Sequence, residues 1–373
     1  MFKEPVFVTR PAMPSLEEFN EYLSKIWDSK VLTNNGPFHK ELEERLVDFL
    51  GVDYLSLFNN GTSALLTALQ SMELEGEVIT TPYTFVATTH ALVWNNLKPV
   101  FVDIDENTFN IDVDKIEKAI TPHTSAILAV HCYGFPCDVE RIEALAKKHN
   151  LKVIYDAAHA FDVKLASRSL LKYGDLSILS FHATKVFNTF EGGAVISPNN
   201  EDKKLIDKLK NFGIVDEVTI DEVGSNGKMS EINAAMGLLQ LEKFNQENLS
   251  RKRAYECYLD LLSEVQGIRT FNIASNVESN YGYFPVLVED SFGVSRDELY
   301  ERLKSFNIFS RRYFYPLISN LPMYRNLESS ASSNLPIANQ IVSRVLCLPI
   351  FADLKLEEVS SIVEAIKSIG SKN

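Results

Sequence analysis

The sequence predicts an α/β fold whose sheet is mostly parallel and covered by helices on both faces. Two observations support this prediction. Short apolar runs with the length of strands alternate along the chain with amphipathic stretches with the length of helices. At this spacing the strands are expected to lie parallel, because each parallel strand needs a crossover that lays a helix on the sheet. Polar and ionisable residues follow several of the runs directly, which is where open α/β sheets hold their ligands.

Length and composition limit the possible classes of protein. The 373 residues exceed the usual size of one domain and indicate about two. We expect a large domain over residues 1–245 and a smaller C-terminal α/β domain over residues 246–373, and leave open whether the N-terminal segment packs with the smaller one. The net charge of −13 argues against a nucleic-acid partner, because phosphate binding needs clustered Lys and Arg.

The location of the protein is also predicted from the sequence. The first residues lack the apolar core of a signal peptide, and no apolar run has the length of a membrane span. A cytoplasmic protein without membrane contact is therefore expected. The four cysteines form no close CxxC pair, so buried free thiols are expected rather than disulfides or a zinc site, and no metal is predicted.

Two amphipathic helices are expected at the N-terminal end. Residues 1–30 contain the first, with apolar positions at Leu16, Phe19, Tyr22, Leu23 and Trp27. Residues 38–50 contain the second, which ends at Gly51, a residue suited to the left-handed helix cap. Both helices are expected to pack against the core.

The first strand, residues 54–58, leads into Asn60, Gly61, Thr62 and Ser63 and then into a helix. A strand, a glycine turn and a helix start form the outline of an anion site, because unpaired amides and the positive end of the helix dipole face the same point. The alternative interpretation is an ordinary capped helix.

Further strands are expected at residues 78–80, 99–103, 126–130 and 151–155. Phe85 lies in the loop after the first of these and either covers a flat ligand ring or fills the core. Asp156 follows the last one directly, with His159 close by. A carboxylate at that position is costly unless it is paired with a cation or with hydrogen-bond donors.

Lys185 is the residue around which the site is expected. It follows an apolar run and is interpreted as a lysine that closes a buried strand. An amine with an ordinary pKa of ~10.4 becomes nucleophilic when it is desolvated or placed near another cation. The alternative is a strand-end lysine whose charge reaches solvent. Ser180, five residues earlier, offers a hydroxyl group to an anion.

Together these residues supply what pyridoxal phosphate needs: an amine, a carboxylate for the ring nitrogen, and a helix start for the phosphate dianion. The chain resembles the DegT/DnrJ/EryC1/StrS family of sugar aminotransferases over essentially its whole length. The resemblance rests on several segments taken jointly and in order: 60–64, 84–85, 156–160, 180–185, 191–193, Asn226 and 234–237.

The resemblance implies the fold of the type I pyridoxal phosphate-dependent transferases, which is like that of aspartate aminotransferase, and a role for each matching residue. Lys185 is the Schiff-base lysine and Asp156 pairs with the pyridinium nitrogen, so both are catalytic. The other implied cofactor-binding residues are Thr62, Ser63 and Ser180 at the phosphate, Phe85 and His159 at the ring, and Asn226, which reaches the cofactor of the neighbouring subunit. A homodimer with shared active sites is therefore implied.

The implied activity is a ping-pong transamination. L-glutamate gives its amino group to the cofactor, which passes it to a keto group on a nucleotide-linked deoxysugar. Segments 32–37 and 179–194 resemble most the family members that aminate C-4 of dTDP-4-oxo-6-deoxy-D-glucose for O-antigen synthesis. Amination at C-3 of a dTDP-3-oxo-6-deoxyhexose is the main alternative, and a non-catalytic regulator that binds pyridoxal phosphate is a remote one.

Residues that contact the nucleotide sugar are less evident from the sequence. Lys228 and the segment 311–316, which begins with two arginines, are candidates because their cations could meet a pyrophosphate. The alternative is that they lie on an exposed strand edge.

Overall fold

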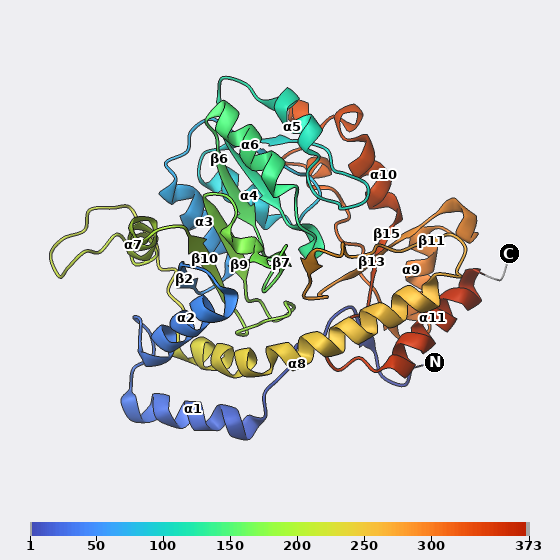
Figure 1. Ribbon diagram of the computed structural model, residues 1–373, viewed down its shortest axis with the longest axis horizontal. Coiled ribbons are helices and arrows are strands. Elements are labelled where there is room, and N and C mark those ends of the chain that lie inside the picture. The colour runs from blue at the N-terminus through green and yellow to red at the C-terminus, as the bar shows by residue number, and fades with distance from the viewer. Residues whose placement is uncertain (1, 371–373) are drawn as a thin grey trace.

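A seven-stranded sheet forms the centre of the computed structural model, which describes residues 2–370 (Figure 1). From one edge to the other its strands are β2 (Tyr54–Phe58), β10 (Gly193–Ser197), β9 (Leu176–Ser180), β6 (Lys152–Asp156), β5 (Thr124–Val130), β3 (Glu77–Thr80) and β4 (Lys98–Phe101). Neighbouring strands are parallel except at β10, which is antiparallel to both β2 and β9. The prediction of a mostly parallel sheet is confirmed.

Helices cover both faces of this sheet because its strands present apolar side chains in both directions. In β2, Leu55 and Leu57 pack on one side and Phe58 packs on the other. The first side is covered by α2 (Pro37–Leu50), α5 (Val113–Ala119), α6 (Val139–His149) and the first half of α8 (Glu231–Leu262). The second side is covered by α3 (Gly61–Ser71), α4 (Ala87–Trp94) and α7 (Asn200–Leu209).

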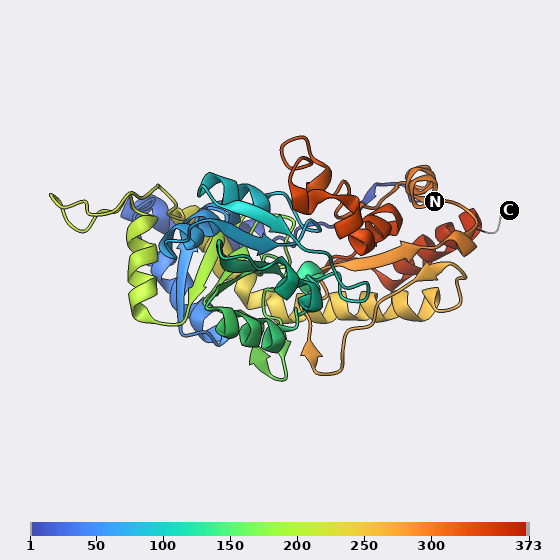
Figure 2. The same cartoon turned by 90° about the horizontal axis from the view of Figure 1, so that it is seen from above.

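A second core lies towards the C-terminal end of the chain (Figure 2). Its antiparallel sheet has the order β11 (Ile268–Arg269), β13 (Phe284–Val288) and β15 (Val345–Leu348). Helices α9 (Arg296–Lys304) and α11 (Leu356–Gly370) pack against it, and α10 (Pro336–Arg344) precedes β15. At the N-terminal end, β1 (Val6–Phe7) pairs with β14 (Ile308–Phe309), so Val6 joins this second core.

Helix α8 connects the two cores. Ala234 and Leu238 pack in the core of the large sheet, whereas Tyr255 and Tyr258, further along the same helix, pack in the second core. The expected boundary at residue 245 therefore falls inside one continuous helix of 32 residues. The division into two domains at this residue stays a prediction.

The first helix differs from its prediction. Helix α1 (Leu16–Ser29) begins at a capping box formed by Ser15 and Glu18, but only Ile26 is buried in it. Leu16 is 67% exposed and Trp27 is 72% exposed. The expectation that both positions pack in the core is wrong. Helix α1 lies on the outer side of α8 and packs against that helix with one face (Figure 1). Helix α2, by contrast, buries Leu42 and Leu46 and ends at Gly51 as predicted.

The remaining elements are small. A three-stranded sheet is formed by β12 (Val277–Glu278), β7 (Lys164–Leu165) and β8 (Arg168–Ser169). All four cysteines are free. Within residues 2–370, no helix is long and apolar enough to cross a membrane.

Candidate active site

A cavity of about 730 Å³ opens where β6 and β9 end, in the size range of small-molecule sites. Most of the residues singled out from the sequence line it, although they come from four separate segments. The lining includes Thr62, Ser63, Phe85, Asp156, His159, Ser180 and Lys185. Asn226, the eighth predicted cofactor-binding residue, is not in the lining.

One end of the cavity is formed by the start of helix α3. Asn60 caps this helix, and its Oδ1 accepts the N–H of Ser63 at 2.8 Å. Ser180 lies so close that a Cβ on Gly61 would come within 2.8 Å of the Ser180 Cβ, which explains the glycine. The helix start and the hydroxyl groups of Thr62, Ser63 and Ser180 therefore border the same space, and this combination suits a phosphate dianion.

Asp156, the last residue of β6, is held by two hydrogen bonds. Its Oδ2 accepts the hydroxyl of Thr88 at 2.8 Å, and its Oδ1 accepts the N–H of Ala158 at 3.1 Å. The residue is only 8% exposed, and burial raises the pKa of its carboxyl, while Thr88, Ala158 and the charge of Lys185 act in the opposite direction. The carboxylate is therefore ready to pair with a protonated ligand nitrogen.

Lys185 does not close a strand, which corrects the sequence interpretation. Strand β9 ends at Ser180, and Lys185 follows in a turn where its N–H donates to the His182 carbonyl at 2.8 Å. Its Nζ lies in the cavity, 3.2 Å from the hydroxyl oxygen of Tyr283. Burial lowers the pKa of the Lys185 amine to about 8, against the opposing effect of Asp156. A large fraction of this amine is therefore neutral and nucleophilic near pH 8.

His159 is buried at the cavity wall with its tautomer defined. It is 7% exposed, and its Nδ1 accepts the N–H of Tyr133 at 3.1 Å. Burial and the nearby charge of Lys185 hold the pKa of the imidazole well below its ordinary value, so the ring is neutral. A neutral ring that accepts at Nδ1 carries its proton on Nε2, which makes His159 a hydrogen-bond donor towards a ligand.

Phe85 is 61% exposed although it lines the cavity, so the alternative of a core aromatic is wrong. Asn226 is exposed, and its carbonyl accepts the side-chain N–H of Asn59, which does line the cavity, at 3.3 Å. Asn226 thus lies beside the rim, and its implied contact with a neighbouring subunit stays a prediction.

The cations expected at the pyrophosphate of the nucleotide sugar, Lys228, Arg311 and Arg312, do not line the cavity. The Lys228 amine donates to Asn211 at 2.8 Å, and Arg312 is paired with Asp297 at 2.7 Å. Arg311 is exposed on the same segment as Tyr313 and Phe314, which do line the cavity. Of the two arginines, Arg311 is therefore the better candidate for an anionic substrate group.

Sequence reasoning missed Thr88 and Tyr283, and it named Tyr313 and Phe314 only as part of the segment 311–316, without a role of their own. Thr88 comes from within α4, and Tyr283, Tyr313 and Phe314 come from the C-terminal part of the chain. The aromatic and hydroxyl side chains themselves carry no spacing signal that marks them. Tyr283, Tyr313 and Phe314 pack in a further apolar cluster, in which the C-terminal part of the chain meets Tyr83 and Phe109 of the large domain.

The cavity fits pyridoxal phosphate on the observed chemistry of its walls. A helix start with hydroxyl groups suits the phosphate, a hydrogen-bonded carboxylate suits the ring nitrogen, and an amine whose pKa is near 8 suits the aldehyde carbon. An exposed aromatic ring and a neutral histidine donor complete the walls. Fold and cavity together define a pyridoxal phosphate-dependent transferase of fold type I.

Comparison with known proteins identifies the family. The profile of the DegT/DnrJ/EryC1/StrS aminotransferase family matches residues 15–367, and the chain belongs to this family. A dTDP-4-amino-4,6-dideoxy-D-glucose transaminase of Escherichia coli is 56% identical over 96% of this chain and 97% of its own length. One of the same name from Shigella dysenteriae is 55% identical over 98% of this chain and 100% of its own length. The crystal structure of DesI in the presence of its TDP-sugar product superposes with a TM-score of 0.94 at 34% identity, covering 100% of this chain and 94% of DesI.

Proposed function

We propose that this protein transfers the amino group of L-glutamate to C-4 of dTDP-4-oxo-6-deoxy-D-glucose, forming dTDP-4-amino-4,6-dideoxy-D-glucose and 2-oxoglutarate. One observation carries the proposal: Lys185 and Asp156 line the same cavity in a chain that is 56% identical to a transaminase named for this product. The C-4 position is favoured over C-3 because that name specifies it. We further propose that the product serves O-antigen or related surface polysaccharide synthesis and that the enzyme works in the cytoplasm.

Pyridoxal phosphate, when bound, supplies an electron sink and carries the amino group between donor and acceptor. The chain's own residues have separate roles in our proposal. Thr62, Ser63 and Ser180 would hold the phosphate, and the Asp156 carboxylate would keep the ring nitrogen protonated. Because the pKa of Lys185 is about 8, its amine can both accept and return a proton near neutral pH.

Two residues shape the space above and beside the ring in this proposal. Phe85, which lines the cavity, would cover one face of the cofactor ring and exclude water from it. His159 donates from Nε2, since its Nδ1 already accepts the N–H of Tyr133. Both assignments agree with the positions of these side chains in the cavity lining.

We also propose a homodimer with shared active sites. The segment after α7 extends away from the rest of the chain in both views (Figures 1 and 2), and its Val215, Val218, Ile220 and Val223 are exposed. Exposed apolar side chains gathered on one extended segment favour burial against a partner. Light scattering should give a mass of twice 42.1 kDa, and a monomer at micromolar concentration would contradict this part of the proposal.

The test follows the cofactor's visible absorbance band in the purified protein. L-glutamate should bleach the band, and dTDP-4-oxo-6-deoxy-D-glucose should restore it, with nitrogen on C-4 of the product by NMR. Lys185→Ala should fold and retain some cofactor, yet lose at least about 10³-fold in turnover, because it removes the residue that moves the proton. Nitrogen on C-3, or wild-type turnover by Lys185→Ala, would overturn the proposal.

A further inference from the structure

We propose that Tyr283 is a positioning residue that holds the free Lys185 amine in the orientation needed for proton transfer. The inference rests on the proposed transaminase function. Its starting observation is the 3.2 Å contact between the Tyr283 hydroxyl oxygen and the Lys185 Nζ. Tyr283 lies 98 positions further along the chain than Lys185, so it stands outside the sequence motif that surrounds the lysine.

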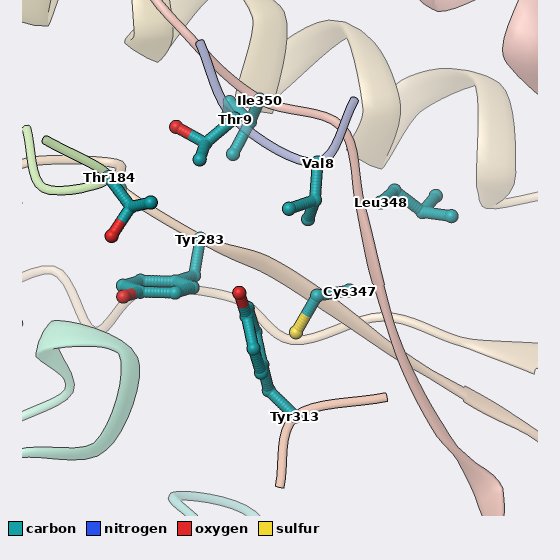
Figure 3. A pocket seen from close by; sticks show the side chains of 9 residues that line it. Val8, Thr9, Thr184, Tyr283, Tyr313, Cys347, Leu348 and Ile350 are labelled. Carbon is teal, nitrogen blue, oxygen red and sulfur yellow. The ribbon is translucent and has the colours of Figure 1, made fainter. Parts of the chain in front are cut away.

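The Tyr283 ring is held by aromatic neighbours from three other segments. Its centroid lies 4.6 Å from that of His159, 5.6 Å from that of Tyr133 and 6.2 Å from that of Tyr313. Figure 3 shows Tyr283 and Tyr313 next to each other, with Thr184, the residue before Lys185, close to the Tyr283 ring. A ring enclosed in this way keeps its hydroxyl group at one place.

The backbone of Tyr283 is also fixed relative to the active site. Asn280, which is fully buried, donates from Nδ2 to the His159 carbonyl at 2.9 Å and accepts the N–H of Gly282 at Oδ1 at 3.1 Å. A Cβ on Gly282 would come within 2.8 Å of a methyl group of Val186, so the glycine permits a close approach to the lysine turn. These contacts connect Tyr283 directly to the segments that carry His159 and Lys185.

A phenol suits this role because it is both a hydrogen-bond donor and an acceptor. Its O–H can donate to the neutral amine, and its oxygen can accept from the ammonium form. Burial raises the pKa of Tyr283 well above its ordinary value, so the phenol keeps its proton while the amine gains and loses one. The other titratable groups in the cavity lining are Asp156, His159, His182, Glu191 and Tyr313. Of these, Asp156 is the one whose charge opposes the fall in the amine's pKa.

The first experiment titrates the amine in the full-length apoenzyme, so it does not depend on turnover. Acetic anhydride labelling of Lys185, followed by mass spectrometry across pH 6–11, should give a midpoint near pH 8 for wild type. In Tyr283→Phe the midpoint should fall by about one pH unit, because the ammonium form loses a charge-assisted bond. Tyr281→Phe is the matched control, since Tyr281 lies two residues upstream outside the cavity lining and should keep the wild-type midpoint.

The second experiment measures kinetics with the loaded enzymes. Tyr283→Phe should lower kcat by about 10- to 100-fold with KM values within about threefold of wild type, because misplacing a reacting group slows the chemical step. A wild-type kcat, or a wild-type midpoint in the labelling experiment, would overturn the inference. The inference would also be overturned if Tyr283→Phe lowered kcat and the melting temperature but left the labelling midpoint unchanged. Tyr283 would then stabilise the fold by packing and would not position the amine. If wild type itself fails to transfer nitrogen, the proposed function fails, whereas the labelling result still decides the role of Tyr283.

Discussion

The hydroxyl of Thr88 should control how tightly the cofactor binds, through Asp156. Thr88→Val keeps the shape of the side chain but removes the donor that lies 2.8 Å from Oδ2 of Asp156. A hydrogen bond to a charged group contributes about 1.5–3 kcal/mol, which corresponds to about one to two pKa units. Burial already raises the pKa of Asp156, and losing Thr88 removes an effect that lowers it, so the pKa should rise further. We expect cofactor affinity to fall by about 10- to 100-fold.

The assay titrates pyridoxal phosphate into apoenzyme and follows binding by absorbance between pH 5.5 and 8.5. The sign of the pH effect follows from the carboxylate, which pairs with the protonated ring nitrogen only when ionised. The pKa of Asp156 is expected to be higher in the variant than in wild type. As the pH is lowered, the variant's affinity for pyridoxal phosphate should therefore begin to decline at a higher pH than the affinity of wild type.

Thr89→Val is the matched control for this variant. Thr89 is the next residue of α4 and is equally buried, but its hydroxyl has no hydrogen-bond partner among the described residues. Replacing it should leave the cofactor affinity unchanged. Equal dissociation constants for the Thr88 variant, the Thr89 variant and wild type across this pH range would refute the reasoning.

Two further predictions concern the stability of the apoenzyme in urea. The pKa of Lys185 is lowered from 10.5 to about 8, so the unfolded chain binds more protons in this window and the free energy of unfolding rises with pH across it. Lys185→Met should therefore be more stable than wild type at pH 7 by about 2 kcal/mol, a value discounted because Lys185 is partly exposed. The variant should lose this advantage by pH 10.5, and a difference in the free energy of unfolding that does not change with pH would contradict the prediction. Asn280→Ala should lower the free energy of unfolding by about 2–4 kcal/mol, because it leaves two carbonyls and the Gly282 N–H unpaired. The exposed Asn320→Ala is its control, and equal losses in both variants would show that the buried amide contributes nothing.

The centre of the site was predictable because parallel strands bring their carboxyl ends to one edge. Asp156 and Ser180 end neighbouring strands, and β2 leads into the helix start at Gly61. Their proximity follows from strand order, and the presence of Lys185 in the same cavity follows from its distance of five residues from Ser180. The fold class was predictable from the alternation of strands with helices, and the family from a resemblance carried by short segments in a set order.

The exposed face of α1 and the position of Asn226 could not be predicted in this way. An amphipathic pattern indicates that one face of a helix is apolar, but it does not say whether that face meets the core or remains exposed. Trp27 fits the helical pattern and is nevertheless exposed. Asn226 lies beside the rim of the cavity in one chain, and its proposed partner belongs to a second chain.

Local sequence thus decides the strands, the helix start and the chemical groups at the strand ends, because each depends on residues within a few positions of one another. The tertiary structure alone decides which distant groups tune them. Thr88 reaches Asp156 across 68 positions and Tyr283 reaches Lys185 across 98, and neither contact leaves a periodic or spaced pattern in the chain. The physical reason is that the pKa and orientation of a buried group depend on every side chain packed around it, wherever those side chains stand in the sequence.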